Sequence, residues 1–317
     1  MCTAKFDDVT AVGWRSGETE HGVAAAARLF CADCTTTPRR PMTSAVRDLL
    51  SPSRLTYVVD VGANRLGGKF RPPYLPMLEA GLCRVTGFEP QPGPLLELQL
   101  RRGPNEFYLP DAVGDGNPHT LNICFASGMT SLLEPDPIAT ELLDVQRASQ
   151  VVERIRLETR RLDDIWEIEH LDFLKIDIQG SELAVFLNGQ NKLTEAVAIQ
   201  TEVSFLTIYQ NQPSFGEVDV ELRCQGFIPH RFIELKLFNV SGHPDKRGGQ
   251  LLEADVVYVR NFLRVEMDDE QLKQLALIAH YRYGSYDLAL RCVKLLEHRH
   301  ALAAGSQQRY IDAVPSE

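Results

Sequence analysis

The sequence has no apolar run that approaches the roughly 20 residues needed to cross a bilayer. It also has no excess of basic residues, since its formal net charge is −10 at pH 7, whereas general nucleic-acid-binding proteins are more often basic. The first residues include Lys5, Asp7 and Asp8 and no continuous apolar core, which is unlike a secretory signal. We therefore expect a cytoplasmic protein with no membrane span and no nucleic-acid partner.

A complete metal-binding motif is absent as well. The seven cysteines are scattered, and without a secretory signal we expect them to be reduced thiols. Cys31 and Cys34 form a single C-x-x-C, but no second C-x-x-C or close Cys/His pair completes a zinc site. We therefore predict no metal ion, and we interpret these two cysteines as ordinary thiols rather than as a redox pair.

What the sequence does contain, from residue 55 onward, is an alternation of short apolar segments with helical ones. The predicted strands are 56–61, 83–90, 105–115, 119–125, 152–159, 171–180, 196–203 and 255–262. The predicted helices between them include 74–81, 93–103, 181–189 and 217–227. This alternation predicts right-handed β-α-β crossovers and an α/β fold with a doubly wound, mostly parallel sheet.

The two ends of the chain differ from this pattern. We expect an N-terminal extension over residues 1–54, a main domain over 55–262 and a C-terminal helical tail over 263–317. The extension contains two short helical segments, 23–30 and 44–50. The tail predicts two helices around Gly284, and their apolar stripes favour packing in the core or contact in a homodimer.

The stretch VVDVGANRLGGKF at 58–70 is the first candidate binding element. An apolar strand ends near Asp60 and runs into a glycine turn at Gly62, and in doubly wound sheets ligands bind beyond the carboxyl ends of the strands. A dinucleotide would need glycine where Asn64 stands, and a P-loop would need Ser or Thr where Phe70 stands. Phosphate binding is therefore disfavoured, and a nucleoside without phosphate, such as S-adenosylmethionine, fits better.

Residues that follow the other strands complete this hypothesis. Glu89 ends the second strand, where a carboxylate can accept hydrogen bonds from ribose hydroxyls, and Asp111 ends the third, where an adenine edge can bind. Thr130 and Ser131, in SGMTSLL, are candidates for contact with cofactor or acceptor. The predicted cofactor-binding residues are Asp60, Gly62, Asn64, Glu89, Pro90, Asp111, Ala112 and Ser131; Gly67 and Gly68 are less certain members of the turn.

An ordered set of motifs then carries a resemblance. The motifs are VVDVGAN, GFEPQP, SGMTSLL, RLDDI, DFLKIDIQGSE, AIQTEVSF and QPSFGEVDVELRCQGF. Over roughly residues 55–262 the chain resembles the FkbM family of S-adenosylmethionine-dependent methyltransferases. The resemblance implies a class I methyltransferase fold with a seven-stranded sheet whose last strand is antiparallel. It also implies O-methylation, typically of hydroxyls on glycans or polyketide-type metabolites. The loop GANRLGGKFRPPY is longer than in many members.

Methyl transfer to a hydroxyl requires alignment of the oxygen, and a nearby base helps because a sugar or alkyl hydroxyl is a weak nucleophile. The candidate catalytic residues are Asp177, Glu202 and His230, and Asp177 is the first choice. Lys175 is expected to share the strand face of Asp177 and to offset its charge. Family members often have Glu where this chain has Gln179, which weakens any role of that position as a base.

Two alternatives stay open. An NAD-dependent oxidoreductase would use a similar fold, although Asn64 argues against it. A non-catalytic S-adenosylmethionine-binding protein would keep the pocket and lack turnover, although Glu89 and Asp177 are both present.

Overall fold

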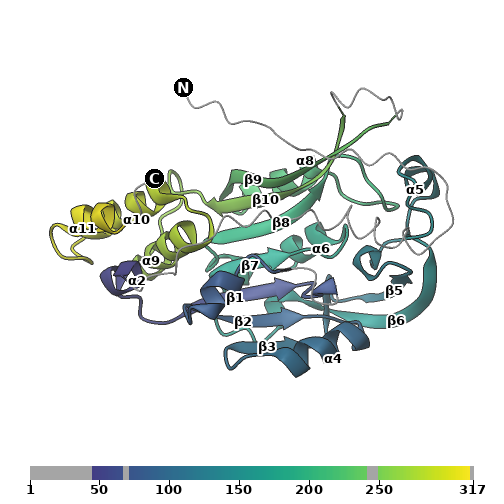
Figure 1. Ribbon diagram of the computed structural model, residues 1–317, viewed down its shortest axis with the longest axis horizontal. Helices are drawn as coiled ribbons and strands as arrows, with labels where there is room; N and C mark the ends of the chain where they lie inside the picture. Colours follow the sequence, from purple (N-terminus) through teal and green to yellow (C-terminus); the bar gives the residue numbers. More distant parts are fainter. Residues whose placement is uncertain (1–44, 67–70, 241–248, 315–317) are drawn as a thin grey trace.

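The computed structural model describes residues 45–66, 71–240 and 249–314. Its centre is a seven-stranded sheet in the order β3-β2-β1-β7-β8-β10-β9 (Figure 1). Neighbouring strands from β3 to β8 pair in parallel, and β10 is antiparallel to both β8 and β9. The strands are β1 (Thr56–Val61), β2 (Cys83–Phe88), β3 (Glu106–Leu109), β7 (Phe173–Ile176), β8 (Ala198–Ser204), β9 (Phe227–Phe238) and β10 (Gln250–Arg260). The predicted α/β class and mostly parallel seven-stranded sheet are confirmed.

One predicted strand is divided in the structure. The segment 105–115, expected as a strand that enters a turn, ends its strand at Leu109 in β3, and the chain resumes as β4 (Ala112–Gly114) in a second sheet. Pro110 separates the two because proline has no N–H to donate to a strand ladder. The second sheet has the order β4-β6-β5, with β5 (Pro118–Cys124) and β6 (Val151–Arg161). Asp111 is thereby left at the gap between the two sheets.

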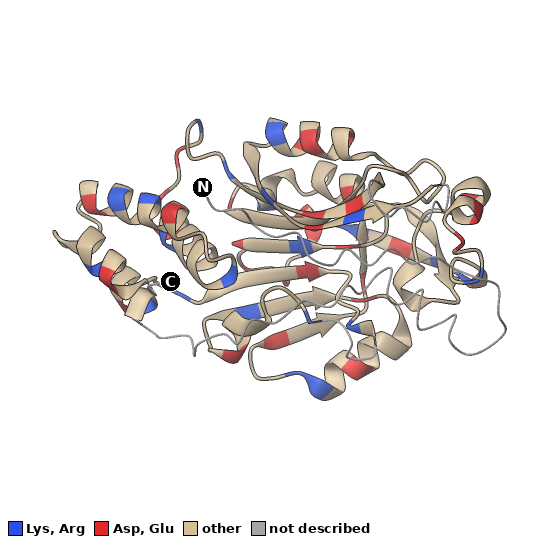
Figure 2. Cartoon of the chain, turned by 45° about the horizontal axis from the view of Figure 1, so that its top comes forward, with Lys and Arg blue, Asp and Glu red and all other residues tan. Residues whose placement is uncertain are grey.

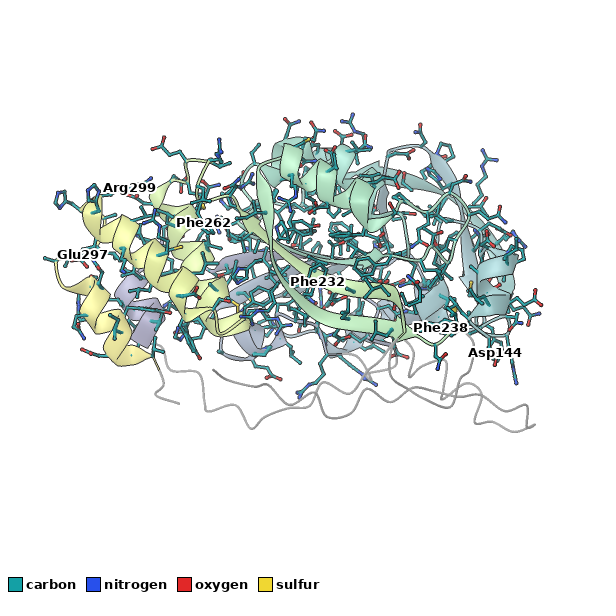
Figure 3. The ribbon with its side chains drawn as sticks, turned by 90° about the horizontal axis from the view of Figure 1, so that it is seen from above. Asp144, Phe232, Phe238, Phe262, Glu297 and Arg299 are labelled. Atoms are coloured by element: carbon teal, nitrogen blue, oxygen red, sulfur yellow. The ribbon has the colours of Figure 1, made fainter. Side chains whose placement is uncertain are left out.

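Strand β9 was not predicted as a separate element. It contains Pro229 and lies at the edge of the sheet, which is where proline is tolerated in a strand. Much of it is half-buried or exposed, so its sequence lacks the continuous apolar character of a central parallel strand. Phe232, on this strand, is 47% exposed and is labelled in Figure 3.

Helices cover both faces of the main sheet because successive strand residues point to opposite sides. One core contains Val59, Leu174 and Ile199 from the strands, together with Val185 and Leu222 from α6 and α8. The remaining elements of the main domain are α3 (Leu75–Glu79), α4 (Pro92–Arg101), η2 (Ser127–Met129), α5 (Pro137–Leu142), η3 (Leu162–Asp164), α6 (Glu182–Leu187), α7 (Gln190–Leu193) and α8 (Phe215–Cys224).

The tail packs on the other face of the sheet, at the opposite end of the molecule from α5 and β6 (Figure 1). It contains α9 (Asp269–Leu277), the π-helix η4 (Ile278–Arg282), α10 (Tyr286–His298) and α11 (Ser306–Ala313), and it contacts α2 (Ala45–Leu50). The predicted helices around Gly284 and over 44–50 are present; α11 was not predicted. The segment 23–30, Cys31, Cys34 and Gly67–Gly68 lie outside the described residues.

The apolar stripe of the tail is buried within the chain itself. Leu272, Leu275 and Ile278 are at most 1% exposed and belong to one core with Val58 and Phe173 of the sheet. This stripe therefore gives no reason to expect a homodimer, which stays an untested prediction. In the part of the chain that the structure describes, no helix combines the length and apolar character of a membrane span.

Candidate functional site

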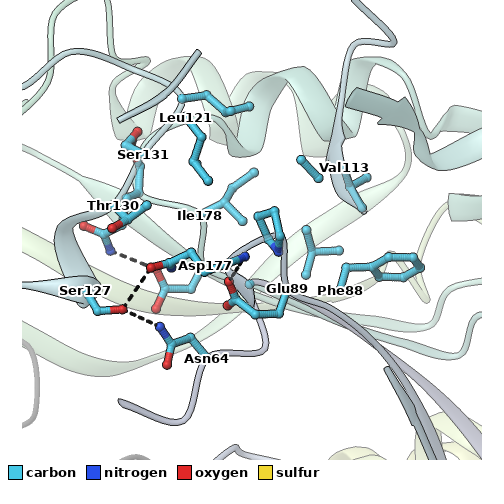
Figure 4. Close-up of a pocket in the computed structure, with 18 of the residues that line it drawn as sticks. Asn64, Phe88, Glu89, Val113, Leu121, Ser127, Thr130, Ser131, Asp177 and Ile178 are labelled. Atoms are coloured by element: carbon cyan, nitrogen blue, oxygen red, sulfur yellow. Dashed lines mark hydrogen bonds between the residues drawn. The ribbon is translucent and has the colours of Figure 1, made fainter. Parts of the chain in front are cut away.

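A pocket opens beyond the carboxyl ends of the central strands (Figure 4). Its cavity is about 110 Å³ and lies between the main sheet and the segments Asp111–Val113 and 127–132. All but two of the predicted site residues line it: Gly62, Asn64, Glu89, Pro90, Asp111, Ala112, Ser131, Asp177 and Glu202. Among the described residues, no group of three or more His, Cys, Asp or Glu could hold a metal ion.

Asp60 is one of the two exceptions. Its carboxylate is 1% exposed and lies behind the glycine turn, where it accepts a hydrogen bond from the Tyr74 hydroxyl at 2.6 Å. Lys175 Nζ lies 3.1 Å from Asp60 Oδ1 and donates to the Gly62 carbonyl at 2.9 Å. Asp60 therefore supports the turn from beneath and does not line the pocket.

The position of Lys175 also corrects a prediction. We expected it to offset the charge of Asp177, but the register of the parallel strands places it directly opposite Asp60. Burial alone would lower the pKa of Lys175, but the carboxylate of Asp60, with a smaller effect from Asp177, raises it. Lys175 thus stays charged and holds the glycine turn to the end of β7.

His230 is the second exception. It lies on the edge strand β9, half-buried, and its Nε2 is 2.7 Å from Ser285 Oγ in the tail. Burial lowers the pKa of this histidine. Because His230 contacts the tail and does not line the pocket, its predicted role as a base has no support in the geometry.

Glu89 lines the pocket. It follows β2, is 2% exposed, and its Oε1 accepts a hydrogen bond from the Gln91 backbone N–H at 2.8 Å. Burial raises the pKa of Glu89 to about 7, although the hydrogen bond from Gln91 counteracts part of this effect.

The glycine turn lies beside Glu89. Gly62 has φ +80°, and a Cβ at this position would lie 2.0 Å from the backbone oxygen of Asp177. Its backbone N–H donates to the Phe88 carbonyl at 3.0 Å. Glycine is therefore required here both for the left-handed backbone and for the close approach of β1 to β7. On the far side, Asp111 is held by Arg160 at 3.0 Å.

The rim of the pocket contains two residues that were not predicted, Gln91 and Ser127. Asn64 Nδ2 donates to Ser127 Oγ at 2.8 Å, and Ser127 Oγ donates to Gln91 Oε1 at 3.2 Å. These contacts join the loops after β1 and β2 to η2 (Figure 4). Ser127 opens the same SGMTSLL motif that drew attention to Ser131, so position alone could have identified it.

The carboxylates of Asp177 and Glu202 both line the pocket. Gln179 Nε2 lies 2.9 Å from Asp177 Oδ1 and 3.0 Å from Glu202 Oε2. Burial and the nearby carboxylates of Glu253 and Asp177 raise the pKa of Glu202 well above its usual range, and Lys236 opposes this effect. Figure 2 shows that acidic and basic residues lie on the strands of the sheet as well as on the helices.

Glu182 has a supporting role in the same region. Its Oε1 accepts hydrogen bonds from the backbone N–H groups of Ile178 and Gly180, at 2.9 and 3.2 Å. It is 5% exposed, and burial raises its pKa to about 7. Glu182 therefore holds the turn after β7 and does not line the pocket.

The chain was compared with known families, curated proteins and solved structures. The model of the FkbM methyltransferase domain matches residues 60–229. No curated protein matches the chain. Among solved structures, the magnesium protoporphyrin IX methyltransferase of Synechocystis, determined with bound S-adenosylmethionine, is 11% identical, with coverage of 78% of this chain and 86% of that one and a TM-score of 0.38. The fibrillarin pre-rRNA processing protein of Methanococcus jannaschii is 12% identical, with coverage of 66% and 67% and a TM-score of 0.33.

Proposed function

Because the chain belongs to the FkbM methyltransferase domain family, we propose that it transfers a methyl group from S-adenosylmethionine to a hydroxyl of a glycan or polyketide-type small molecule. The observation that supports this most is one pocket lined both by Glu89, which follows β2, and by Asp177, which follows β7. Two such carboxylates suit a ligand that offers ribose hydroxyls to one of them and a reacting group to the other.

The residues present fit S-adenosylmethionine. Glu89 and Gly62 both line the pocket. We assign Glu89 to the ribose hydroxyls and the turn at Gly62 to the methionine end. Asp111 and Ala112 form the wall assigned to adenine. When bound, S-adenosylmethionine supplies a methyl group that is already activated by the sulfonium charge.

At the reacting end, the protein must align a hydroxyl and exclude water. We assign to Asp177 the binding of the acceptor hydroxyl and the removal of its proton, because its carboxylate lines the pocket. Glu202 is the less suitable base, since burial favours its protonated form. Ser131 also lines the pocket.

The affinity for S-adenosylmethionine should rise with pH. The ionised carboxylate of Glu89 accepts hydrogen bonds from ribose hydroxyls better than the protonated form, and its pKa is about 7. Calorimetric titrations should therefore show about a tenfold gain in affinity between pH 6 and pH 8, since the ionised fraction rises by about that factor. Glu89→Gln should remove most of this pH dependence and weaken binding at pH 8 by about 10- to 100-fold.

Glu97→Gln is the matched control, because Glu97 is exposed on α4 and does not line the pocket. It should bind like the wild type. Tight binding of NAD, with no heat from S-adenosylmethionine or its demethylated product, would favour an oxidoreductase. Cofactor binding without methyl transfer to any hydroxyl acceptor would favour a non-catalytic binding protein.

A further inference from the structure

The turn that follows β7 bends a glutamine back over the end of its own strand. Gln179 has φ +58° and is followed by Gly180 with φ +102°. A left-handed conformation is unfavourable for a residue with a side chain, and such strain persists only where surrounding contacts enforce it. Here Ser131 Oγ donates to the Gln179 carbonyl at 2.7 Å, and Glu182 accepts from the N–H of Gly180.

The amide of Gln179 contacts three groups at once. Besides Asp177 and Glu202, its Oε1 lies 2.9 Å from the hydroxyl of Tyr209, which is also 3.0 Å from the Met129 carbonyl. The Tyr209 hydroxyl donates to the amide oxygen of Gln179, which turns the NH₂ group of the amide towards the two carboxyl groups. The side chain is 7% exposed, and Tyr209 is 2% exposed.

The same contacts distinguish the two carboxylates. Asp177 and Glu202 lie on adjacent parallel strands, one step beyond the pairing of Ile176 with Thr201. Glu202 Oε2 accepts from Gln179, and Glu202 Oε1 lies 3.7 Å from Lys236 Nζ. Asp177 uses only Oδ1 for Gln179, and among the described residues no hydrogen bond reaches its Oδ2. That oxygen is therefore available within the pocket.

We propose that Gln179 is a positioning residue, which clamps Asp177 and Glu202 into one unit and leaves Asp177 Oδ2 free for the acceptor hydroxyl. This inference rests on the proposed methyl transfer at the same site. A neutral amide suits this position better than a third carboxylate would, because one NH₂ group supplies both hydrogen bonds without adding negative charge.

The test is the titration of the carboxyl pair, followed by ¹³C NMR of side-chain carboxyl carbons in the full-length protein without ligand. Gln179→Met keeps an unbranched side chain, and hence similar backbone strain, but removes both donors. We expect the pair to take up its first proton at a pH about one to two units higher than in the wild type. Gln179→Glu should shift the same event in the same direction, because a protonated carboxyl has one proton to donate.

Other charged groups face the pair: Lys175 on β7, Lys236 on β9, and Glu253 and Asp255 on β10. The carboxylates among them must be assigned in the same spectra. Signals of Asp177 and Glu202 are identified by their loss in Asp177→Asn and Glu202→Gln. Gln225→Met is the matched control, since Gln225 bonds to Phe186 and Glu221 at the end of α8. It should leave the titration of the pair unchanged.

The outcomes separate cleanly. A titration of the pair in both Gln179 variants that stays within about 0.3 pH units of the wild type, or equals that of Gln225→Met, overturns the clamp. A downward shift overturns it as well. Both outcomes are measured on the protein without ligand. Failure of the wild-type protein to bind S-adenosylmethionine would refute the proposed function, but the titration would still test the clamp.

Discussion

Replacement of Asp177 by Asn should lower the turnover of methyl transfer by about two to four orders of magnitude, which is the usual contribution of a positioned general base. The variant keeps the shape of the side chain and loses the charge that accepts the proton. The affinity for S-adenosylmethionine should change by less than about threefold, because other residues of the pocket, Glu89, Asp111 and Ala112, are the ones assigned to its ribose and adenine. The measurement is transfer of a labelled methyl group to the wild-type protein's acceptor, with calorimetry for the cofactor.

Asp144→Asn is the appropriate control. Asp144 is exposed, has φ +55°, a conformation that Asn also tolerates, and does not line the pocket. In Figure 3 it lies at the opposite end of the molecule from Glu297 and Arg299 of the tail. If Asp177→Asn turned over at the wild-type rate, Asp177 would have no role in the mechanism. Alignment of the acceptor hydroxyl with the methyl group would then account for the rate alone.

Gly62→Ala should impair both cofactor binding and turnover, and it should also destabilise the fold. The added Cβ would lie 2.0 Å from the backbone oxygen of Asp177 and 3.1 Å from a side-chain carbon of Ile178. Backbone cannot move aside as a flexible side chain can, and the left-handed φ adds about 1 kcal/mol of strain. With overpacking of about 1 to 3 kcal/mol, we expect the free energy of unfolding to fall by about 2 to 4 kcal/mol.

Thermal unfolding with and without S-adenosylmethionine checks this expectation. The melting temperature of Gly62→Ala should fall by about 3 to 6 °C, and the cofactor should restore little of it because the turn is displaced. Gly93→Ala is the control, since a Cβ there meets nothing within 4 Å. Normal cofactor affinity in Gly62→Ala would mean that the turn adjusts freely and that its contact with β7 is unimportant.

The sequence could predict the location of the site because strand ends are readable from local pattern. The apolar run before Gly62, the carboxylate at Glu89 and the apolar strand before Asp177 each mark where a parallel strand stops. In a doubly wound sheet these ends meet at one edge, so residues far apart in sequence could be assigned to one pocket. The α/β class and the mostly parallel sheet follow from the alternation of strands and helices.

What could not be predicted depends on register and backbone conformation. The pairing of Lys175 with Asp60 follows from the alignment of two parallel strands that lie more than a hundred residues apart. The approach of Gln179 to two carboxylates requires a left-handed backbone at Gln179, and a residue other than glycine gives no sign of this conformation in the sequence. The distance of His230 from the pocket could not be predicted for a related reason, since the position of an edge strand depends on the order of the whole sheet.

The contact between Gly62 and Asp177 also bears on how the specificity of such an enzyme can be altered. No side chain fits between these two strand ends, so neither can be redesigned without disturbing the other. The rim is different, because Asn64, Ser127 and Gln91 meet there through side chains alone. Engineering of a new acceptor range should therefore begin at the rim, where exchanges are independent of the backbone that holds the reacting carboxylate.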